Sequence, residues 1–284
     1  MMRRCVVLLG LLACSKHEAR QKPTPETPVV LKCEQQPFAQ STTVPEASGA
    51  AWLDDNRLVV VSDSGHKGDY VLVDAEKGDT LESGKLPLGM GTDDLEGLAF
   101  RDDKLYGLSS NGFMRVWQRE KKGFLMLDGP YPIGQGDFVC DLEKTNCAKN
   151  YEGLALAPTP SSECAGFACS KEEGRLYCLT QGGDGRYQID PNRHIDVEKK
   201  DVLADCAFSP SGELYVGNNL FGLSHVYRID GWQDTQTAKV TPIDALGIGF
   251  AEVIAAKGDI IYRMSDTGGA PSLMAKFRCA PSTR

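Results

Sequence analysis

Short apolar stretches alternate with polar turns along most of the chain, and the same pattern recurs about every fifty residues. Each unit begins with a short apolar strand, passes a polar turn such as Asp102-Asp103, and continues with a second strand that ends in Ser, Asn, Asp or Gly. A third alternating strand follows, as in residues 69–78 and 113–120. The units start at Ser48, Glu96, Glu152, Asp205 and Glu252, separated by 48, 56, 53 and 47 residues. This spacing predicts an antiparallel all-β repeat.

Four strands in about fifty residues are the unit of a β-propeller blade. The five units predict five blades, with six as the alternative, whereas a β-sandwich leaves the matching starts unexplained. We read the unit from Glu152 as interrupted by a cysteine-containing insertion, with its second strand at Arg175. Residues 29–45 precede the first unit and are expected to supply the outer strand of the last blade, which would close the ring.

The N-terminal residues lie outside this repeat. Arg3 and Arg4 precede nine apolar residues, 5–13, and then Cys14. A membrane-spanning helix needs about 20 residues, so this stretch is typical of the apolar region of a signal peptide. Residues 11–14 resemble a lipobox, which predicts removal of residues 1–13 and lipidation of Cys14. An ordinary secretory signal is the alternative.

Residues 14–28 predict a tether, because the segment after Cys14 contains three prolines and almost no apolar side chains. Residues 29–284 are then the folded domain. Ser15 after the lipidated cysteine resembles the sorting pattern of outer-membrane lipoproteins. We therefore expect a lipoprotein of the bacterial cell envelope, attached to the outer membrane through the lipid at Cys14.

Charge narrows the possible partners. The chain carries −8 at neutral pH, and loss of Arg3 and Arg4 with the signal lowers this to −10. An acidic surface disfavours nucleic acid and anionic lipid headgroups as general partners. An envelope protein, a glycan or a small molecule bound at one face of the propeller remains as the expected partner.

Eight cysteines remain after Cys5 and Cys14 are set aside, and an even number in an exported protein predicts disulfides. Zinc is disfavoured because the sequence has neither a CxxC pair nor a nearby histidine cluster. The expected pairs are Cys140–Cys147, Cys164–Cys169 and Cys33–Cys279, which leaves Cys178 and Cys206 in neighbouring blades.

The repeat also predicts where polar side chains gather. In a propeller the first strand of each blade lines the channel and the second runs antiparallel to it, so the start of the first and the end of the second share one mouth. The predicted strand starts are Ser48, Glu96, Glu152, Asp205 and Glu252. The second strands are predicted to end at Ser62, Ser109, Thr180, Asn218 and Ser265, followed by Asp63, Ser110, Gln181, Asn219 and Asp266.

Several carboxylates around one mouth repel each other unless their pKa values rise, water screens them, or a cation binds. Their hard oxygens suit Ca²⁺, which takes six to eight oxygen ligands. The predicted ligands are Glu96, Glu152, Asp205, Asn218 and Glu252. In the alternative interpretation each acid accepts backbone N–H bonds within its blade or pairs with a base such as Arg263. His66 is the one histidine near this mouth, and a lone loop histidine is more often solvated.

Asp94-Leu95-Glu96-Gly97-Leu98-Ala99 and its echo, residues 151–155, resemble a motif of phytase-like, esterase-like propellers and of related SdiA-regulated exported propellers. In the wider superfamily of calcium-dependent propeller hydrolases, acids at the blade starts hold the ion. The resemblance implies that Glu96 and Glu152 are ligands. This chain departs from that pattern because it has no assignable catalytic His or Lys and one blade fewer.

The sequence thus favours a lipid-anchored envelope propeller with a binding or scaffolding role. A calcium-dependent phosphoesterase or esterase is the alternative, with the metal polarising the substrate and activating water. Whether the protein is an enzyme stays open, since no nucleophile elbow, P-loop or dinucleotide fingerprint occurs in the sequence.

Overall fold

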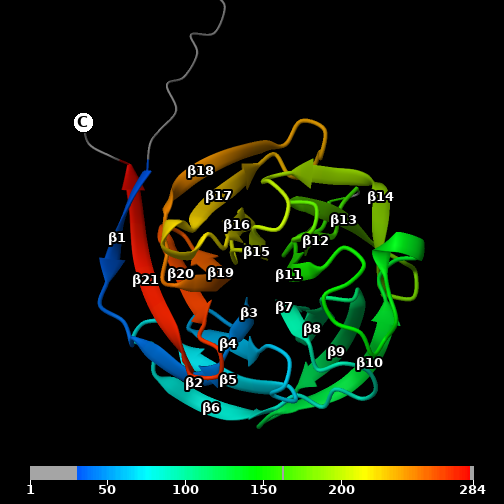
Figure 1. Cartoon of the computed structure of the whole chain (residues 1–284), viewed down its shortest axis with the longest axis horizontal. Coiled ribbons are helices and arrows are strands. Elements are labelled where there is room, and N and C mark those ends of the chain that lie inside the picture. Colours follow the sequence, from blue (N-terminus) through cyan, green and yellow to red (C-terminus); the bar gives the residue numbers. More distant parts are fainter. Residues whose placement is uncertain (1–30, 162, 282–284) are drawn as a thin grey trace, which may run out of the picture.

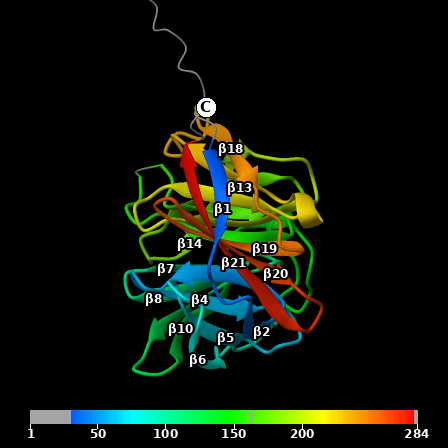
Figure 2. The same ribbon diagram turned by 90° about the vertical axis from the view of Figure 1, so that its left-hand side faces the viewer.

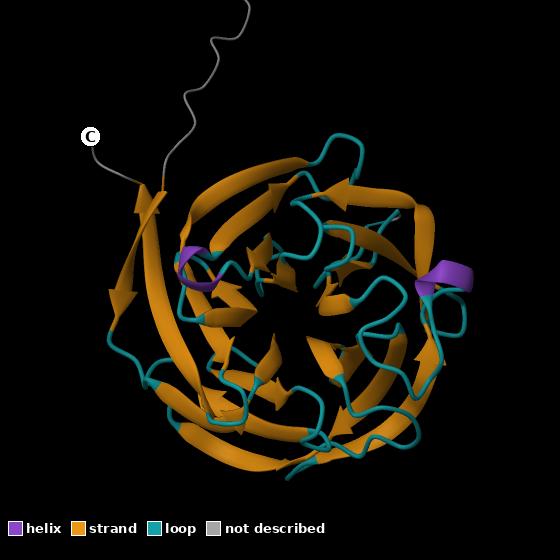
Figure 3. Cartoon of the chain, in the orientation of Figure 1, coloured by secondary structure: helices purple, strands orange, loops and turns teal. Residues whose placement is uncertain are grey.

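Five antiparallel sheets surround a central axis in the computed structural model, which describes residues 31–161 and 163–281 (Figure 1). Strands make up almost the whole disc, with two short 3-10 helices, η1 (Gly136–Phe138) and η2 (Phe221–Leu223), among the described residues (Figure 3). The predicted five-bladed all-β propeller is therefore confirmed.

Each of the first four blades is built from consecutive strands, and the first strand of each is innermost. Blade 1 contains β3 (Ala47–Trp52), β4 (Arg57–Ser62), β5 (Asp69–Asp74) and β6 (Thr80–Lys85). Blade 2 contains β7 (Leu95–Arg101), β8 (Lys104–Ser109), β9 (Phe113–Arg119) and β10 (Phe124–Pro132). Blade 3 contains β11 (Tyr151–Leu156), β12 (Gly166–Ser170), β13 (Arg175–Gln181) and β14 (Tyr187–Asp196). Blade 4 contains β15 (Leu203–Phe208), β16 (Leu214–Asn218), β17 (His225–Asp230) and β18 (Lys239–Ala245).

Blade 5 joins the two ends of the domain. It contains β19 (Phe250–Lys257), β20 (Ile260–Asp266), β21 (Pro271–Pro281) and, as its outer strand, β1 (Leu31–Gln36), while β2 (Ser41–Pro45) also pairs with β21. Figure 2 shows β1 and β21 side by side at the edge of the disc. Cys33 lies opposite Cys279 in their register, and the two form a disulfide. The predicted closure by the N-terminal strand and its disulfide are both confirmed.

Apolar side chains between neighbouring blades form the core. Five clusters of buried residues fill the five junctions, and each draws on two adjacent sheets. Trp117, for example, is fully buried between blades 1 and 2, and its indole N–H donates to the carbonyl of Pro87 at 2.7 Å. Large aromatic side chains such as Trp117 thus stabilise contacts between blades, because burial of a large ring contributes strongly to stability.

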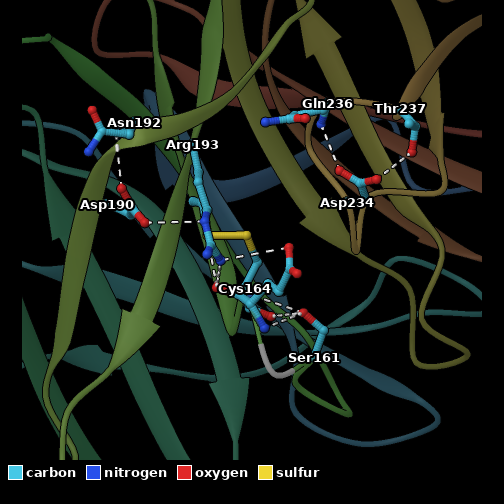
Figure 4. Close-up of polar contacts among 10 residues, drawn as sticks. Ser161, Cys164, Asp190, Asn192, Arg193, Asp234, Gln236 and Thr237 are labelled. Carbon is cyan, nitrogen blue, oxygen red and sulfur yellow. Dashed lines mark hydrogen bonds and ion pairs between the residues drawn. A yellow bond between two sulfur atoms is a disulfide. The ribbon is translucent and has the colours of Figure 1, made fainter.

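The other disulfides follow the strand assignment of blade 3. Cys140–Cys147 is confirmed, but Cys164 pairs with Cys178 and Cys169 pairs with Cys206. The expected Cys164–Cys169 bond was wrong because Cys169 lies inside β12, whereas Cys164 precedes that strand and lies near β13. Figure 4 shows the Cys164 bridge beside Arg193, whose guanidinium contacts Asp190.

Four disulfides are typical of proteins outside the cytoplasm. The predicted signal sequence, the predicted lipidation site at Cys14 and the predicted tether lie outside the described residues. Within the described part of the chain, no helix has the length and apolar character needed to cross a membrane.

Candidate functional site

A β-bulge at the second or third residue shapes the start of every innermost strand. The register with the second strand shifts between Leu95 and Gly97 in blade 2, and the corresponding shift occurs in all five blades. A bulge bends the strand and re-aims the extra side chain. The residues at this position are Ser48, Glu96, Glu152, Ala204 and Glu252. Three blades therefore direct a glutamate toward the mouth.

Glu96 is part of a cluster of three carboxylates. One oxygen each of Asp63, Asp94 and Glu96 lies within 4.8 Å of the others, a group that could hold a metal ion. Asp63 follows β4, and Asp94 directly precedes β7. The Ser110 hydroxyl donates to the Asp94 carboxylate and itself accepts the backbone N–H of Asn146 at 2.8 Å. Asp94 is thus held in place by the loop that follows blade 2.

The Glu96 carboxylate differs from its neighbours in having no protein partner. Glu96 is only 5% exposed, and among the residues that the structure describes no hydrogen bond or ion pair reaches its carboxylate. Burial raises the pKa of Glu96 well above its ordinary value, and the charges of Glu152, Asp63 and Asp94 raise it further. Burial also raises the pKa of Asp94 to about 6, with Asp63 adding to the shift. A cation between these groups would relieve the repulsion.

The other two glutamates at the bulge position have protein partners. The Lys171 ammonium donates to Glu152 at 3.0 Å, and the Asn219 amide donates to Glu252 at 3.2 Å. Burial raises the pKa of Glu152 to about 7 against the opposing charge of Lys171. Burial raises the pKa of Glu252 to about 7 as well, with Asp266 adding to the shift and Lys171 opposing it. These groups lie close enough to interact across the mouth.

Asp205 has a different position from the glutamates. Ala204 takes the bulge position in β15, so Asp205 lies one residue further along than the repeat predicted. Its carboxylate accepts the backbone N–H groups of Cys206 at 2.7 Å and of Ile254, in blade 5, at 2.9 Å. Burial raises the pKa of Asp205 well above its ordinary value, while these bonds and the charge of Arg263 act against the shift. Asp205 thus joins blades 4 and 5.

Asn218 also uses its side chain within the protein. Its amide oxygen accepts the backbone N–H of His225 at 2.6 Å, and its amide nitrogen donates to Glu198 at 3.2 Å. Asn218 therefore stabilises the turn from β16 into β17. Of the five residues predicted as calcium ligands, only Glu96 belongs to the close carboxylate cluster, while Glu152 and Glu252 lie nearby.

The strand order of blade 3 corrects the predicted set of mouth residues. Its second strand is β12, which lies in the segment taken as an insertion, and β13 from Arg175 is the third strand. Thr180 and Gln181 therefore lie at the end of β13 away from the mouth, where β14 begins. Ser170 and Lys171 occupy their expected place, since Ser170 pairs with Tyr151. The signal that could have found them is the short apolar run GFAC before Ser170 and Lys171.

Buried serines complete the mouth at the ends of the inner strands. They are Ser48, Ser62, Ser109 and Ser265. The Ser48 hydroxyl donates to the carbonyl of Leu95 and so connects blade 1 to blade 2. Ser109 accepts a bond from Arg115 at 2.7 Å, while the hydroxyls of Ser62 and Ser265 contact no other polar group of the described residues.

The other end of the channel has a ring of alanines at its wall. The residue three positions after the bulge residue is alanine in all five innermost strands, namely Ala51, Ala99, Ala155, Ala207 and Ala255. These alanines line a cavity of about 550 Å³ that lies beyond the bulges, and Asp54, Asp55, Asp102 and Asp103 also line it. Between the two ends, Gly97 and Gly153 bring β7 and β11 into backbone contact, because a Cβ on Gly97 would lie 2.3 Å from the nitrogen of Leu154. The carboxylates of the mouth are not part of this lining, so the mouth and the cavity are distinct sites.

No family model and no curated protein matches the sequence. The chain is similar in structure to glutaminyl cyclase from Myxococcus xanthus, with a TM-score of 0.54 and 17% identity over 90% of this chain and 100% of that one. It is also similar to the PQQ-bound form of aldose sugar dehydrogenase from Streptomyces coelicolor, with a TM-score of 0.54 and 14% identity over 89% and 99% of the two chains. At these identities the comparisons establish the fold alone: the chain is a β-propeller similar to these enzymes.

Proposed function

We propose that this protein is an exported, lipid-anchored propeller of the cell envelope that binds Ca²⁺ at its mouth and uses that end to bind a ligand. The observation that carries the proposal is the Glu96 carboxylate, which is nearly buried beside Asp63 and Asp94 and has no hydrogen-bond partner among the described residues. A carboxylate this enclosed and without a protein partner is costly unless it is protonated, hydrated or bound to a cation.

The donor chemistry favours calcium over zinc. The cluster of Asp63, Asp94 and Glu96 offers carboxylate oxygens, which suit a hard cation of flexible geometry, and water would complete its coordination. Zinc prefers sulfur and imidazole ligands. All eight cysteines in the described part of the chain are disulfide-bonded, and His66 lies 2.6 Å from Glu46.

Export and anchoring rest on the sequence and on the disulfides together. The apolar segment before Cys14 is too short to span a bilayer, and four disulfides suit an oxidising compartment. An outer-membrane lipoprotein satisfies both. Labelling of cells with radioactive palmitate, comparing the natural chain with Cys14→Ser, tests the anchor.

Calorimetric titration of the purified domain with CaCl₂ tests the cation site. We expect saturable binding and a rise in melting temperature, both strongly reduced in Glu96→Gln. Glu34→Gln is the matched control, because Glu34 is an exposed residue of β1. The absence of both binding heat and a thermal shift at saturating calcium would contradict the proposal.

A calcium-dependent hydrolase is the second candidate. It is supported by Glu152 and Glu252, whose pKa values of about 7 suit general acid–base catalysis near neutral pH, with Lys171 beside them. Assays on generic phosphomonoester, phosphodiester and carboxylester substrates, with calcium or with EDTA, test it. Calcium-dependent turnover that disappears in Glu152→Gln but persists in Glu34→Gln would favour the enzyme.

A further inference from the structure

We propose that the mouth-side loops of blades 4 and 5 form a docking surface for a polypeptide segment that carries a basic side chain next to a large apolar one. The surface consists of Leu220, Phe221, Leu223 and Phe250, and is called the apolar rim below. The inference deepens the proposed function, because it names the ligand of the mouth. It rests on the mouth being the binding end and does not require the cation.

The apolar rim is a contiguous group of exposed large side chains. Its four members expose between 44 and 69% of their surface, although residues of this kind are usually buried. The rings of Phe221 and Phe250 stack edge to face with their centroids 4.9 Å apart, so η2 and the first residue of β19 form one patch. Contiguous apolar patches on a soluble domain mark interaction sites, whereas single exposed residues do not.

The backbone holds this patch in place. Phe221 has a φ of 53°, in the left-handed region that bulky residues avoid. The Ser224 hydroxyl donates to the carbonyl of Phe221 at 2.8 Å, and the carbonyl of Ser224 accepts the N–H of Leu246 at 2.7 Å. Gly247 packs so closely on the loop that a Cβ there would lie 2.7 Å from the backbone of Gly222. The fold thus maintains an unfavourable conformation that keeps the aromatic side chain in solvent.

The charge beside the apolar rim indicates the chemistry of the partner. Asn219 precedes the rim and donates to Glu252, which lies two residues after Phe250. Asp266 pairs with Phe250 in the register of β19 and β20, and its charge acts on Glu252 against that of Lys171. A lysine or arginine side chain would be attracted to these carboxylates while an adjacent apolar side chain packs on Phe221 and Phe250.

A polypeptide fits this surface better than a membrane does. Anionic headgroups would be repelled by the acids that border the apolar rim, and the chain as a whole carries −8. The rim is open rather than enclosed, since each side chain keeps close to half of its surface or more in solvent. A small molecule needs a site that buries most of its surface, whereas an extended peptide can lie across an open one.

Selection from a random peptide library displayed on phage tests the inference. The bait is the whole disulfide-bonded domain, immobilised through its C-terminus, in parallel selections with calcium and with EDTA. We expect enriched sequences in which Lys or Arg lies within two residues of Phe, Trp or Leu. A synthetic peptide of the enriched sequence should bind roughly tenfold more weakly to Phe221→Ser and to Phe250→Ser, as interface anchors do. In EDTA, Glu252→Gln should weaken binding as well.

Leu81→Ser is the matched control, because Leu81 is an exposed residue of the outer strand β6, and its binding should be unchanged. Melting curves of each variant verify folding. The inference is overturned if the selection enriches no peptide sequence. It is also overturned if the peptide binds the natural chain and both Phe variants with equal affinity. Binding to anionic vesicles that is lost in Phe221→Ser overturns it as well. If the protein binds the peptide in EDTA but gives no heat in the calorimetric titration with CaCl₂, the result supports the docking surface and contradicts the cation site. Calcium binding without peptide enrichment would do the reverse.

Discussion

The ammonium of Lys171 lies 3.0 Å from a carboxylate oxygen of Glu152, and Lys171 occupies the place in blade 3 that Asp63 and Asp266 occupy in blades 1 and 5. Blade 3 therefore brings a positive charge to the mouth where two other blades bring a negative one. The glutamates at the bulge position are not equivalent as a result. Glu152 pairs with Lys171, whereas the charges that act most strongly on Glu96 are those of other acids.

Replacement of this lysine should destabilise the protein in a pH-dependent way. In Lys171→Met a buried carboxylate loses its partner, which costs about 1–3 kcal/mol where Glu152 is ionised. The pKa of Glu152 is already about 7, so at about pH 5.5 it binds a proton and the cost is small. Urea unfolding at about pH 8 and pH 5.5 measures the difference.

Lys149→Met provides the control for that experiment. Lys149 pairs with Glu173 at 2.9 Å, and the pKa of Glu173 is lowered, because bonds from Tyr177 and Lys149 outweigh its burial. Glu173 is therefore ionised at both pH values, and the control should lose a similar amount of stability at each. Equal losses of unfolding free energy at both pH values in Lys171→Met would contradict the protonation of Glu152 as the cause.

The metal-free domain should lose stability as pH rises from about 4.5 to 7. Glu152 and Glu252 have ordinary pKa values of 4.5 and folded values of about 7, so in this window the folded state binds more protons than the unfolded state. Stability then falls with pH. Calcium competes with protons for carboxylates, so the rise in melting temperature on adding calcium should grow over the same window. Melting scans in EDTA and in calcium, repeated across this pH window, measure both the loss of stability and the rise in melting temperature. A calcium-induced rise that does not change with pH would refute the competition between calcium and protons.

The closure disulfide should contribute more stability than the local one. Cys33–Cys279 spans 246 residues, whereas Cys140–Cys147 spans 7. Loss of a native disulfide costs about 2–5 kcal/mol, and more for a longer loop in the chain-entropy model. Denaturant midpoints of Cys33→Ser/Cys279→Ser and Cys140→Ser/Cys147→Ser provide the comparison. A larger loss of stability in Cys140→Ser/Cys147→Ser would contradict the prediction that ring closure makes Cys33–Cys279 the more stabilising bond.

Substitution of Gly97 by alanine should destabilise the ring. The added Cβ would lie 2.3 Å from the backbone nitrogen of Leu154, and backbone cannot rotate away as a side chain can. Overpacking of this kind costs about 1–3 kcal/mol or more. Gly183→Ala is the control, because no atom lies within 4 Å of a Cβ there. Similar melting temperatures for the two variants would show that β7 and β11 can separate freely.

The repeat was enough to predict the number of blades, the closing strand and the concentration of acids at one mouth. Each depends on a pattern that recurs five times, so an error in one unit does not change the result. Glu96, Glu152 and Glu252 share a bulge position for the same reason.

The details of single blades could not be predicted in the same way. Asp205 resembles the glutamates in charge, but a bulge residue is recognised by its register, and the register places Ala204 there. The segment that contains β12 was predicted to be an insertion because of its cysteines. Cys169 is instead a strand residue that bonds to Cys206 in another blade. Asp94 joins the carboxylate cluster from outside any strand, where the repeat has no position for it.

The pairing of β1 with β21 also constrains how the protein reaches its folded form. These strands lie at opposite ends of the chain, so the fifth sheet lacks its outer edge until the last strand has been synthesised and exported. Contacts of such high sequence separation form slowly, and an unpaired edge invites pairing with another molecule. During biogenesis β1 therefore remains unpaired until β21 is available, and Cys33 and Cys279 in these strands are 246 residues apart, so this is the interval in which a chaperone would matter most.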